Sequence, residues 1–150
     1  MAKKVFVSAA LLLSSCALAW GQTGKYGSGD NTVEITANNS TLTINVTGDA
    51  TTMETEICTA IEKAIADGNY STITVNGGGQ INSAIVQSIT HSKLTTIDLG
   101  TTTVKDFNQS TFTWDDVNLQ TITLPLTTVD AEGKMTVPEY ALNAPLFNSN

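Results

Sequence analysis

The segment "LTTIDLG" (94–100) decides the fold, because its core recurs along the chain. The related segments are "STITVNG" (71–77), "LQTITLP" (119–125) and a looser copy, "LTINVTG" (42–48). All four share the core Thr-Ile-x-Val/Leu, and the isoleucines of the last three copies in the chain are 24 and 25 residues apart. Such repetition predicts a solenoid in which every copy forms one strand.

The segments between the strands carry helical patterns. Over 52–67 apolar residues recur at four-residue steps, Thr51 and Glu54 form a capping-box pattern, and Gly68 supplies a stop. A shorter pattern of the same kind covers 81–90. Strands joined by crossovers of this length run parallel. We therefore expect a helix over 52–67, a strand over 72–75, a helix over 81–90, and strands over 96–99 and 121–124, with an irregular stretch between the last two.

Alternation along these strands separates two sets of side chains. The apolar ladder consists of Ile73, Val75, Ile97, Leu99, Ile122 and Leu124, supported by Leu94 and Leu119. The set on the opposite face consists of Thr72, Thr74, Thr96, Asp98, Thr121 and Thr123. We expect the ladder to be almost fully buried and the second set to form an exposed polar sheet face that binds a partner.

The residues before the first helix alternate between apolar and polar types. Val33 and Ile35 precede Asn38-Asn39, and Leu42, Ile44 and Val46 follow, which predicts a β-hairpin with an Asn-Asn turn. The Gly-rich residues 22–31 are expected to be a flexible leader. Residues 32–69 then form a hairpin plus a capping helix, and 70–150 form the repeated coils.

The first 21 residues have the pattern of a secretory signal peptide. Lys3 and Lys4 precede an apolar run over 5–20 that is too short to span a bilayer comfortably. Small residues before Gln22 suit a signal peptidase, whereas "LSSC" (13–16) is similar to a bacterial lipobox, which would make Cys16 a lipidated first residue. Either route takes the protein out of the cytoplasm, to a secreted or cell-surface location.

Composition narrows the classes of partner. After residue 21 the chain has five lysines against 14 acids, a net charge of −9, and no arginine. This charge disfavours nucleic acid and electrostatic docking to anionic lipid, so a membrane contact would depend on a lipid anchor. The 25 threonines suggest a β-rich extracellular protein. Cys58 is the single cysteine certain to remain, so it forms no intrachain disulfide and is expected to be a packed thiol.

From about residue 70 onward the sequence resembles BspA-type leucine-rich repeats, whose units carry a Leu-x-x-Ile-x-Leu-Pro strand and an aromatic-Ala-Phe box. The strand motif corresponds to Leu94, Ile97 and Leu99, and to Leu119, Ile122, Leu124 and Pro125; the box corresponds to Tyr140, Ala141 and Leu142. Only the last strand ends in Pro, and Leu142 stands where the family has Phe. The resemblance implies a right-handed, leucine-rich-repeat-like α/β solenoid and a secreted or surface-attached bacterial protein that acts in adhesion.

Few residues suggest chemistry. His91, the single histidine, lies in a link between helix and strand with no catalytic motif around it. The segment "GGGQ" (77–80) lacks the Lys-Ser/Thr of a phosphate-binding loop, so a tight turn is expected there. Asp115 and Asp116 are adjacent and lack the spaced oxygen ligands of a calcium loop. We therefore expect no catalytic residue, no metal and no cofactor.

The resulting hypothesis is a non-enzymatic, adhesin-like protein that presents the polar sheet face to a protein or glycan. Trp114 and Tyr140 are the aromatic residues that could contribute to an interface, although packing over their own coils is the preferred interpretation. A structural segment of a longer repeat array, and a carbohydrate-active or peptidase module, are the alternatives. Because no cap is visible after the 121–124 strand, we also expect self-association at that edge, a mobile tail or a longer natural chain, with Leu146 and Phe147 partly exposed.

Overall fold

The protein, represented by a computed structural model, is described over residues 24–89, 91–107, 111 and 118–136. Within these residues it is a mixed α/β fold with a six-stranded and a four-stranded sheet. The elements in chain order are β1 (Gly24–Ser28), β2 (Asn31–Asn38), β3 (Thr41–Thr47), η1 (Ala50–Met53), α1 (Glu54–Asp67), β4 (Thr72–Asn76), β5 (Gln80–Asn82), α2 (Ser83–Ser88), β6 (Thr96–Asp98), β7 (Thr103–Lys105), β8 (Thr121–Thr123), β9 (Thr127–Val129) and β10 (Met135–Thr136).

The larger sheet has the strand order β1-β2-β3-β4-β6-β8. From β3 onward every pair is parallel, with Leu42, Ile73, Ile97 and Ile122 in one register. The predicted parallel pairing of the repeated segments is therefore confirmed, and the looser copy at 42–48 belongs to the same ladder.

The predicted hairpin is also present, as the antiparallel pair β2–β3. Its turn is one residue later than expected, because Asn38 pairs with Thr41 and leaves Asn39 and Ser40 as the loop. Asn39 has φ +52°, in the left-handed region that asparagine tolerates better than most residues.

The smaller sheet was not predicted. Its strands β5, β7 and β9 pair in parallel, and β10 adds antiparallel to β9. A bridge between Asp49 and Gln80 extends this ladder back toward β3. Each parallel strand of the larger sheet is thus followed, after a short turn, by a pairing in the smaller one. The three-residue strands carry too little alternation to be recognised from sequence. They form because each one pairs with the neighbouring strand of the smaller sheet.

Two other expectations need correction. Residues 24–28 are not a flexible leader but strand β1, in which Tyr26 lies opposite Val33 and packs against the core. The helix expected over 81–90 is shorter, because Gln80–Asn82 form β5 and α2 covers only Ser83–Ser88. The Asn82 side chain accepts a hydrogen bond from the Ile85 N–H and so begins α2.

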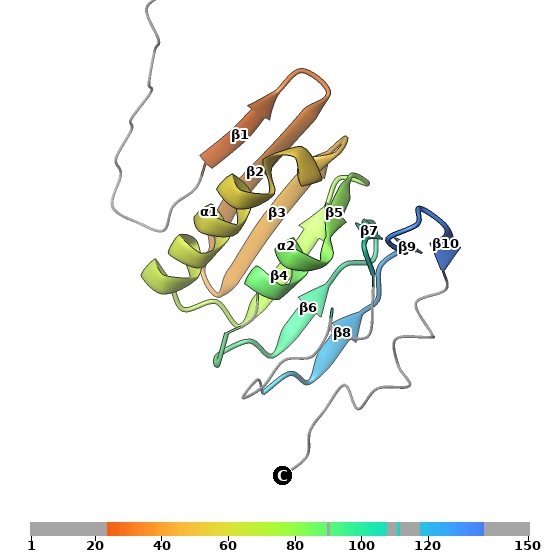
Figure 1. The fold of residues 1–150 in the computed structure, drawn as a ribbon. Helices are drawn as coiled ribbons and strands as arrows, with labels where there is room; N and C mark the ends of the chain where they lie inside the picture. Colours follow the sequence, from red (N-terminus) through yellow and green to blue (C-terminus); the bar gives the residue numbers. More distant parts are fainter. Residues whose placement is uncertain (1–23, 90, 108–110, 112–117, 137–150) are drawn as a thin grey trace, which may run out of the picture.

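Helix α1 confirms the helix predicted at 52–67 and ends before Gly68. The predicted capping box does not form. Instead, Asp49 precedes the 3₁₀ turn η1, and its carboxylate accepts a hydrogen bond from the Thr51 N–H at 3.0 Å. Both helices lie over one face of the larger sheet (Figure 1), where Ile57, Ile61 and Ile85 are fully buried. The core therefore lies between this face and the helices.

Burial of the apolar ladder falls toward β8. Ile73, Ile97 and Leu99 are completely inaccessible and Val75 is nearly so, as predicted, and Leu94 is buried beneath them. Ile122 and Leu124 are only partly buried, as is Leu119, so the prediction of near-complete burial was wrong for the last strand. The reason is positional: among the described residues no strand pairs with the far side of β8.

Candidate functional site

The candidate site is the side of the larger sheet opposite the helices, which we call the outer face. In Figure 1 the helices lie in front of the sheet, so the outer face is turned away from the viewer. Its side chains are those that alternate with the buried ladder. They include Glu34, Thr36, Asn38, Thr41, Thr43, Asn45, Thr72, Thr74, Asn76, Thr96, Asp98, Thr121 and Thr123.

The six predicted site residues come together in two rows across the strands. In the first row Thr72, Thr96 and Thr121 are register partners. In the second row Thr74, Asp98 and Thr123 are register partners. Neighbours within a row are separated by one strand spacing, about 4.8 Å, and the two rows by two residues along a strand, about 6.6 Å.

The structure extends both rows beyond the predicted residues. Thr41 pairs with Thr72, and Thr43 with Thr74, so β3 adds a threonine to each row. On β2, Asn38 lies opposite Thr41 and Thr36 opposite Thr43. Thr41 and Thr43 flank Leu42, the first residue of the looser sequence copy, so this copy was the signal that could have identified them. The β2 residues could not be assigned without the antiparallel register.

The outer face is polar, with few charges. Thr72, Thr74, Thr96 and Asp98 are half-buried, because a strand lies on each side of them, whereas Thr121 and Thr123 at the edge are exposed. Asp98 Oδ1 accepts a hydrogen bond from the Gly100 N–H at 2.9 Å, which leaves the other carboxylate oxygen for a partner. Each threonine hydroxyl can both donate and accept, so the rows offer repeated two-way hydrogen-bonding groups.

The residues considered for chemistry have local structural roles or lie outside the description. Gly77 and Gly78, with φ +96° and +71°, form the turn between β4 and β5, as expected. His91 Nδ1 accepts a hydrogen bond from the Lys93 N–H at 3.3 Å, and Nε2 has no hydrogen-bond partner in the described part of the chain. Burial, with Lys93 nearby, lowers the pKa of His91. Asp115, Asp116, Trp114, Tyr140, Leu146, Phe147 and Cys16 lie outside the described residues.

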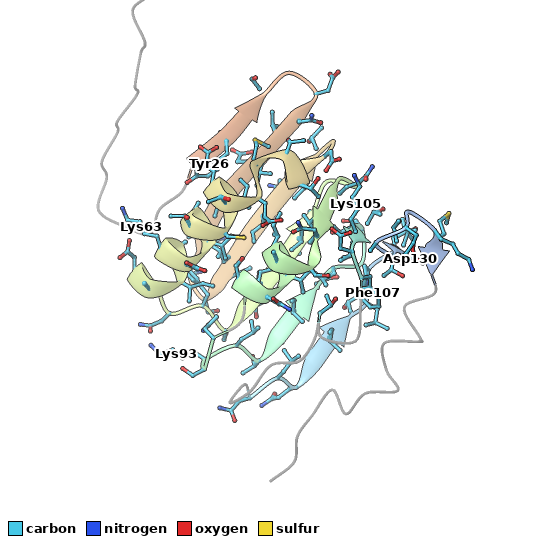
Figure 2. All side chains as sticks on the ribbon, viewed as in Figure 1. Tyr26, Lys63, Lys93, Lys105, Phe107 and Asp130 are labelled. Atoms are coloured by element: carbon cyan, nitrogen blue, oxygen red, sulfur yellow. The ribbon has the colours of Figure 1, made fainter. Side chains whose placement is uncertain are left out.

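A polar corner lies where the smaller sheet meets η1. Lys105 Nζ is 2.6 Å from Asp49 Oδ2, and Asn31 Oδ1 accepts the Asp49 N–H. Figure 2 shows Lys105 at the end of the molecule where the smaller sheet lies. Asn82 donates to the Glu54 carboxylate beside it. A shallow hollow near this corner is lined by Thr51, Thr52, Met53, Glu54, Thr55 and Glu56, all from one short segment. These contacts hold the start of α1 on the smaller sheet.

Three further observations concern metals, membranes and the free thiol. Among the described residues, no three of His, Cys, Asp or Glu lie close enough to hold a metal ion. No helix in the same part of the chain has the length and apolar character to span a bilayer. Cys58 on α1 is half-buried, and burial raises the pKa of its thiol, in agreement with a packed cysteine.

Comparisons with protein families, with curated proteins and with solved structures gave no match to this chain. The resemblance to BspA-type repeats therefore stays a prediction from the residues that carry it.

Proposed function

We propose that the chain is a non-enzymatic, secreted or surface-anchored interaction protein that binds its partner through the outer face. The observation that supports this most is the alignment of the threonine rows. Thr41, Thr72, Thr96 and Thr121 occupy one register across four consecutive parallel strands. A parallel sheet normally has both faces covered, whereas neither helix of the described residues lies over the outer face, so its polar parallel strands support a binding role.

The architecture that we propose is a right-handed, leucine-rich-repeat-like solenoid. Two observations support it. The last three sequence copies pair in register in the larger sheet, and the segments after them pair in parallel in the smaller sheet. Helices return the chain between the first copies. Parallel strands connected by crossovers are right-handed in nearly all proteins. Each turn of such a solenoid adds one threonine-bearing strand, which explains why the same tetrapeptide recurs.

A glycan is the partner that suits this face better than a protein. The outer-face residues are mainly threonine and asparagine, which match the hydroxyl groups of sugars as donors and acceptors. Protein interfaces rely on buried Trp, Tyr and Arg anchors, and none of the outer-face residues named above is of these types. A protein partner is the second arm of the test.

The test is a binding screen of the chain from Gln22 onward against a glycan array and matrix proteins. Thr74→Val and Thr96→Val remove a hydroxyl from each row and keep the β-branched shape. The matched control is Thr55→Val on the exposed side of α1. We expect the two sheet variants to weaken glycan binding at least several-fold and the control to leave it unchanged. Equal binding by all variants would exclude the outer face.

Two other functions were considered. A structural segment of a longer repeat array is favoured by the far side of β8, with which no described strand pairs, and it predicts that no ligand binds. A glycosidase would need two carboxyl groups facing each other across a pocket, roughly 5–10 Å apart. In the hollow at 51–56, Glu54 and Glu56 are two positions apart on α1 and point to different sides, and Glu54 is engaged by Asn82. The enzymatic candidate is therefore the weaker one.

A further inference from the structure

Among the described residues, strand β8 ends the larger sheet and has peptide groups without a backbone partner. The Thr121 N–H donates to Thr95, and the Thr123 carbonyl accepts from the Leu99 N–H, so these residues point their peptide groups toward β6. In a β-strand the N–H and C=O of the next residue point the opposite way. The peptide groups of Ile122 and Leu124 therefore point to the open side, and neither residue has a backbone partner there in the described part of the chain.

Apolar side chains accompany these free groups. Ile122 and Leu124 are partly exposed, although their counterparts Ile97 and Leu99 one strand earlier are completely buried. Leu126, directly after β8, is 71% exposed. The apolar core thus reaches the surface at this edge, and covering it would extend the core by one more strand.

The other sheet ends differ from β8. On β1, at the opposite edge of the larger sheet, Lys25 carries a charge and the backbone is irregular at Gly27, which has φ +78°. The smaller sheet ends at β10, which has only two residues and follows Lys134, and at β5, where the Asp49–Gln80 bridge continues the ladder. Charges, irregular backbone and covering strands are the usual protections against edge pairing. Between Asp116 and Asp130 the sequence has no charged residue, so β8 has no such charge on either side.

We propose that β8 pairs antiparallel with β8 of a second copy, about a two-fold axis at Thr123, and forms a dimer with one continuous sheet. This register uses the free peptide groups of both Ile122 and Leu124, because each pairs with the other residue of the second copy. It also places Ile122 against Leu124 of the second copy on the core side. The edge is therefore complementary to itself, as a two-fold interface requires.

Charge agrees with this choice of partner. Each copy carries a net charge of −9 after residue 21, so two copies repel each other unless the contact avoids the acids. The uncharged run around β8 does so. The dimer does not depend on the proposed glycan binding, but it would join the threonine rows of two copies into one longer face and raise avidity for a repetitive ligand.

The first measurement is the molar mass of the chain from Gln22 onward, by sedimentation over a range of concentrations. We expect a reversible monomer–dimer equilibrium that shifts toward dimer as salt screens the negative charge. Leu126→Lys should shift it toward monomer by about tenfold or more. Met135→Lys, at an equally exposed apolar position of 72% on β10, is the matched control and should have no effect.

The second measurement tests the register by disulfide formation in a Cys58→Ala background. Thr123 lies opposite itself across the axis in a non-hydrogen-bonded pair, with Cα atoms about 4.5 Å apart, so Thr123→Cys should cross-link rapidly. Thr121→Cys is the control, because its two copies would lie roughly 13 Å apart and cannot be bridged. A strict monomer at every concentration, or equal cross-linking at both positions, would overturn the proposal. Loss of glycan binding alone would leave it standing, since mass and cross-linking do not depend on a ligand.

Discussion

Lys105 and Asp49 form an ion pair across 56 positions of the chain, with 2.6 Å between Lys105 Nζ and Asp49 Oδ2. Lys105 is the last residue of β7, and Asp49 holds the bridge that extends the smaller sheet as well as the cap of η1. The ion pair therefore joins the segments after the first and third copies of the repeat, and the bridge from Asp49 to Gln80 joins the segment after the second.

This ion pair predicts a specific pH dependence. Burial by itself raises the pKa of Asp49, but hydrogen bonds from Lys105 and Thr51 outweigh it and hold the pKa below its usual value. A carboxyl group with a lowered folded pKa stabilises the protein above its unfolded pKa of about 3.9, and this contribution is lost as the pH falls through the folded value. As the pH falls below about 4, the thermal midpoint of the parent should therefore fall more steeply than that of the Asp49→Asn variant.

Mutations at neutral pH can distinguish the contribution of the ion pair to stability from that of the Asp49 cap of η1. The side chains of Lys105 and Asp49 are 34% and 29% exposed, so solvent screening limits the coupling between them to about 0.2–1 kcal/mol. Asp49→Ala loses the cap as well and should cost about 1 kcal/mol more than Asp49→Asn. A double-mutant cycle with Lys105→Met, measured by urea unfolding, gives the coupling directly. A coupling of zero would mean that the pair adds no stability.

Core positions in one ladder should differ in sensitivity. Ile97 is completely buried between β4 and β8, so Ile97→Ala should lower the free energy of unfolding by about 2–5 kcal/mol. Ile122→Ala should cost clearly less, because Ile122 is partly exposed and the space it leaves opens to solvent. Urea unfolding of both variants makes the comparison. Equal losses of unfolding free energy would show that β8 is covered in solution. The proposed dimer also covers β8 at high protein concentration. The two variants should therefore be compared at low concentration.

Turn glycines provide another matched pair. A Cβ at Gly77 would lie 2.3 Å from the Val46 carbonyl oxygen, and φ is +96°. Gly29 has φ +62°, and no atom lies within 4 Å of its Cβ position. Gly29→Ala should therefore cost only the left-handed strain of about 1 kcal/mol, whereas Gly77→Ala should cost more than about 3 kcal/mol because backbone must move. Similar thermal midpoints for the two variants would contradict the tight turn.

The anchoring hypothesis rests on the sequence alone. If Cys16 is lipidated, Cys16→Ala should release the protein from the membrane fraction, and metabolic palmitate should label only the parent. A soluble parent chain that begins at Gln22 would show that the lipobox pattern is fortuitous.

How much of this fold the sequence reveals depends on the range of the interactions involved. Ile73 and Ile97 could be assigned to neighbouring parallel strands because alternation and repeat spacing are local signals, and α1 followed from its four-residue period. The six predicted outer-face residues follow from the same alternation. The glycine turn after β4 was likewise readable from composition.

Tertiary structure decided what local pattern leaves open. Three-residue strands such as β5 and β7 form because they hydrogen-bond to a neighbouring strand. Strand β1 is stabilised because the Tyr26 side chain packs against the core. Ile122 has the same sequence context as Ile97 but a different burial, since no strand of the described residues pairs with the far side of β8. The sequence by itself determined which residues alternate and repeat. Only the tertiary structure decided which of them have a neighbour, because pairing and burial depend on segments that are distant along the chain.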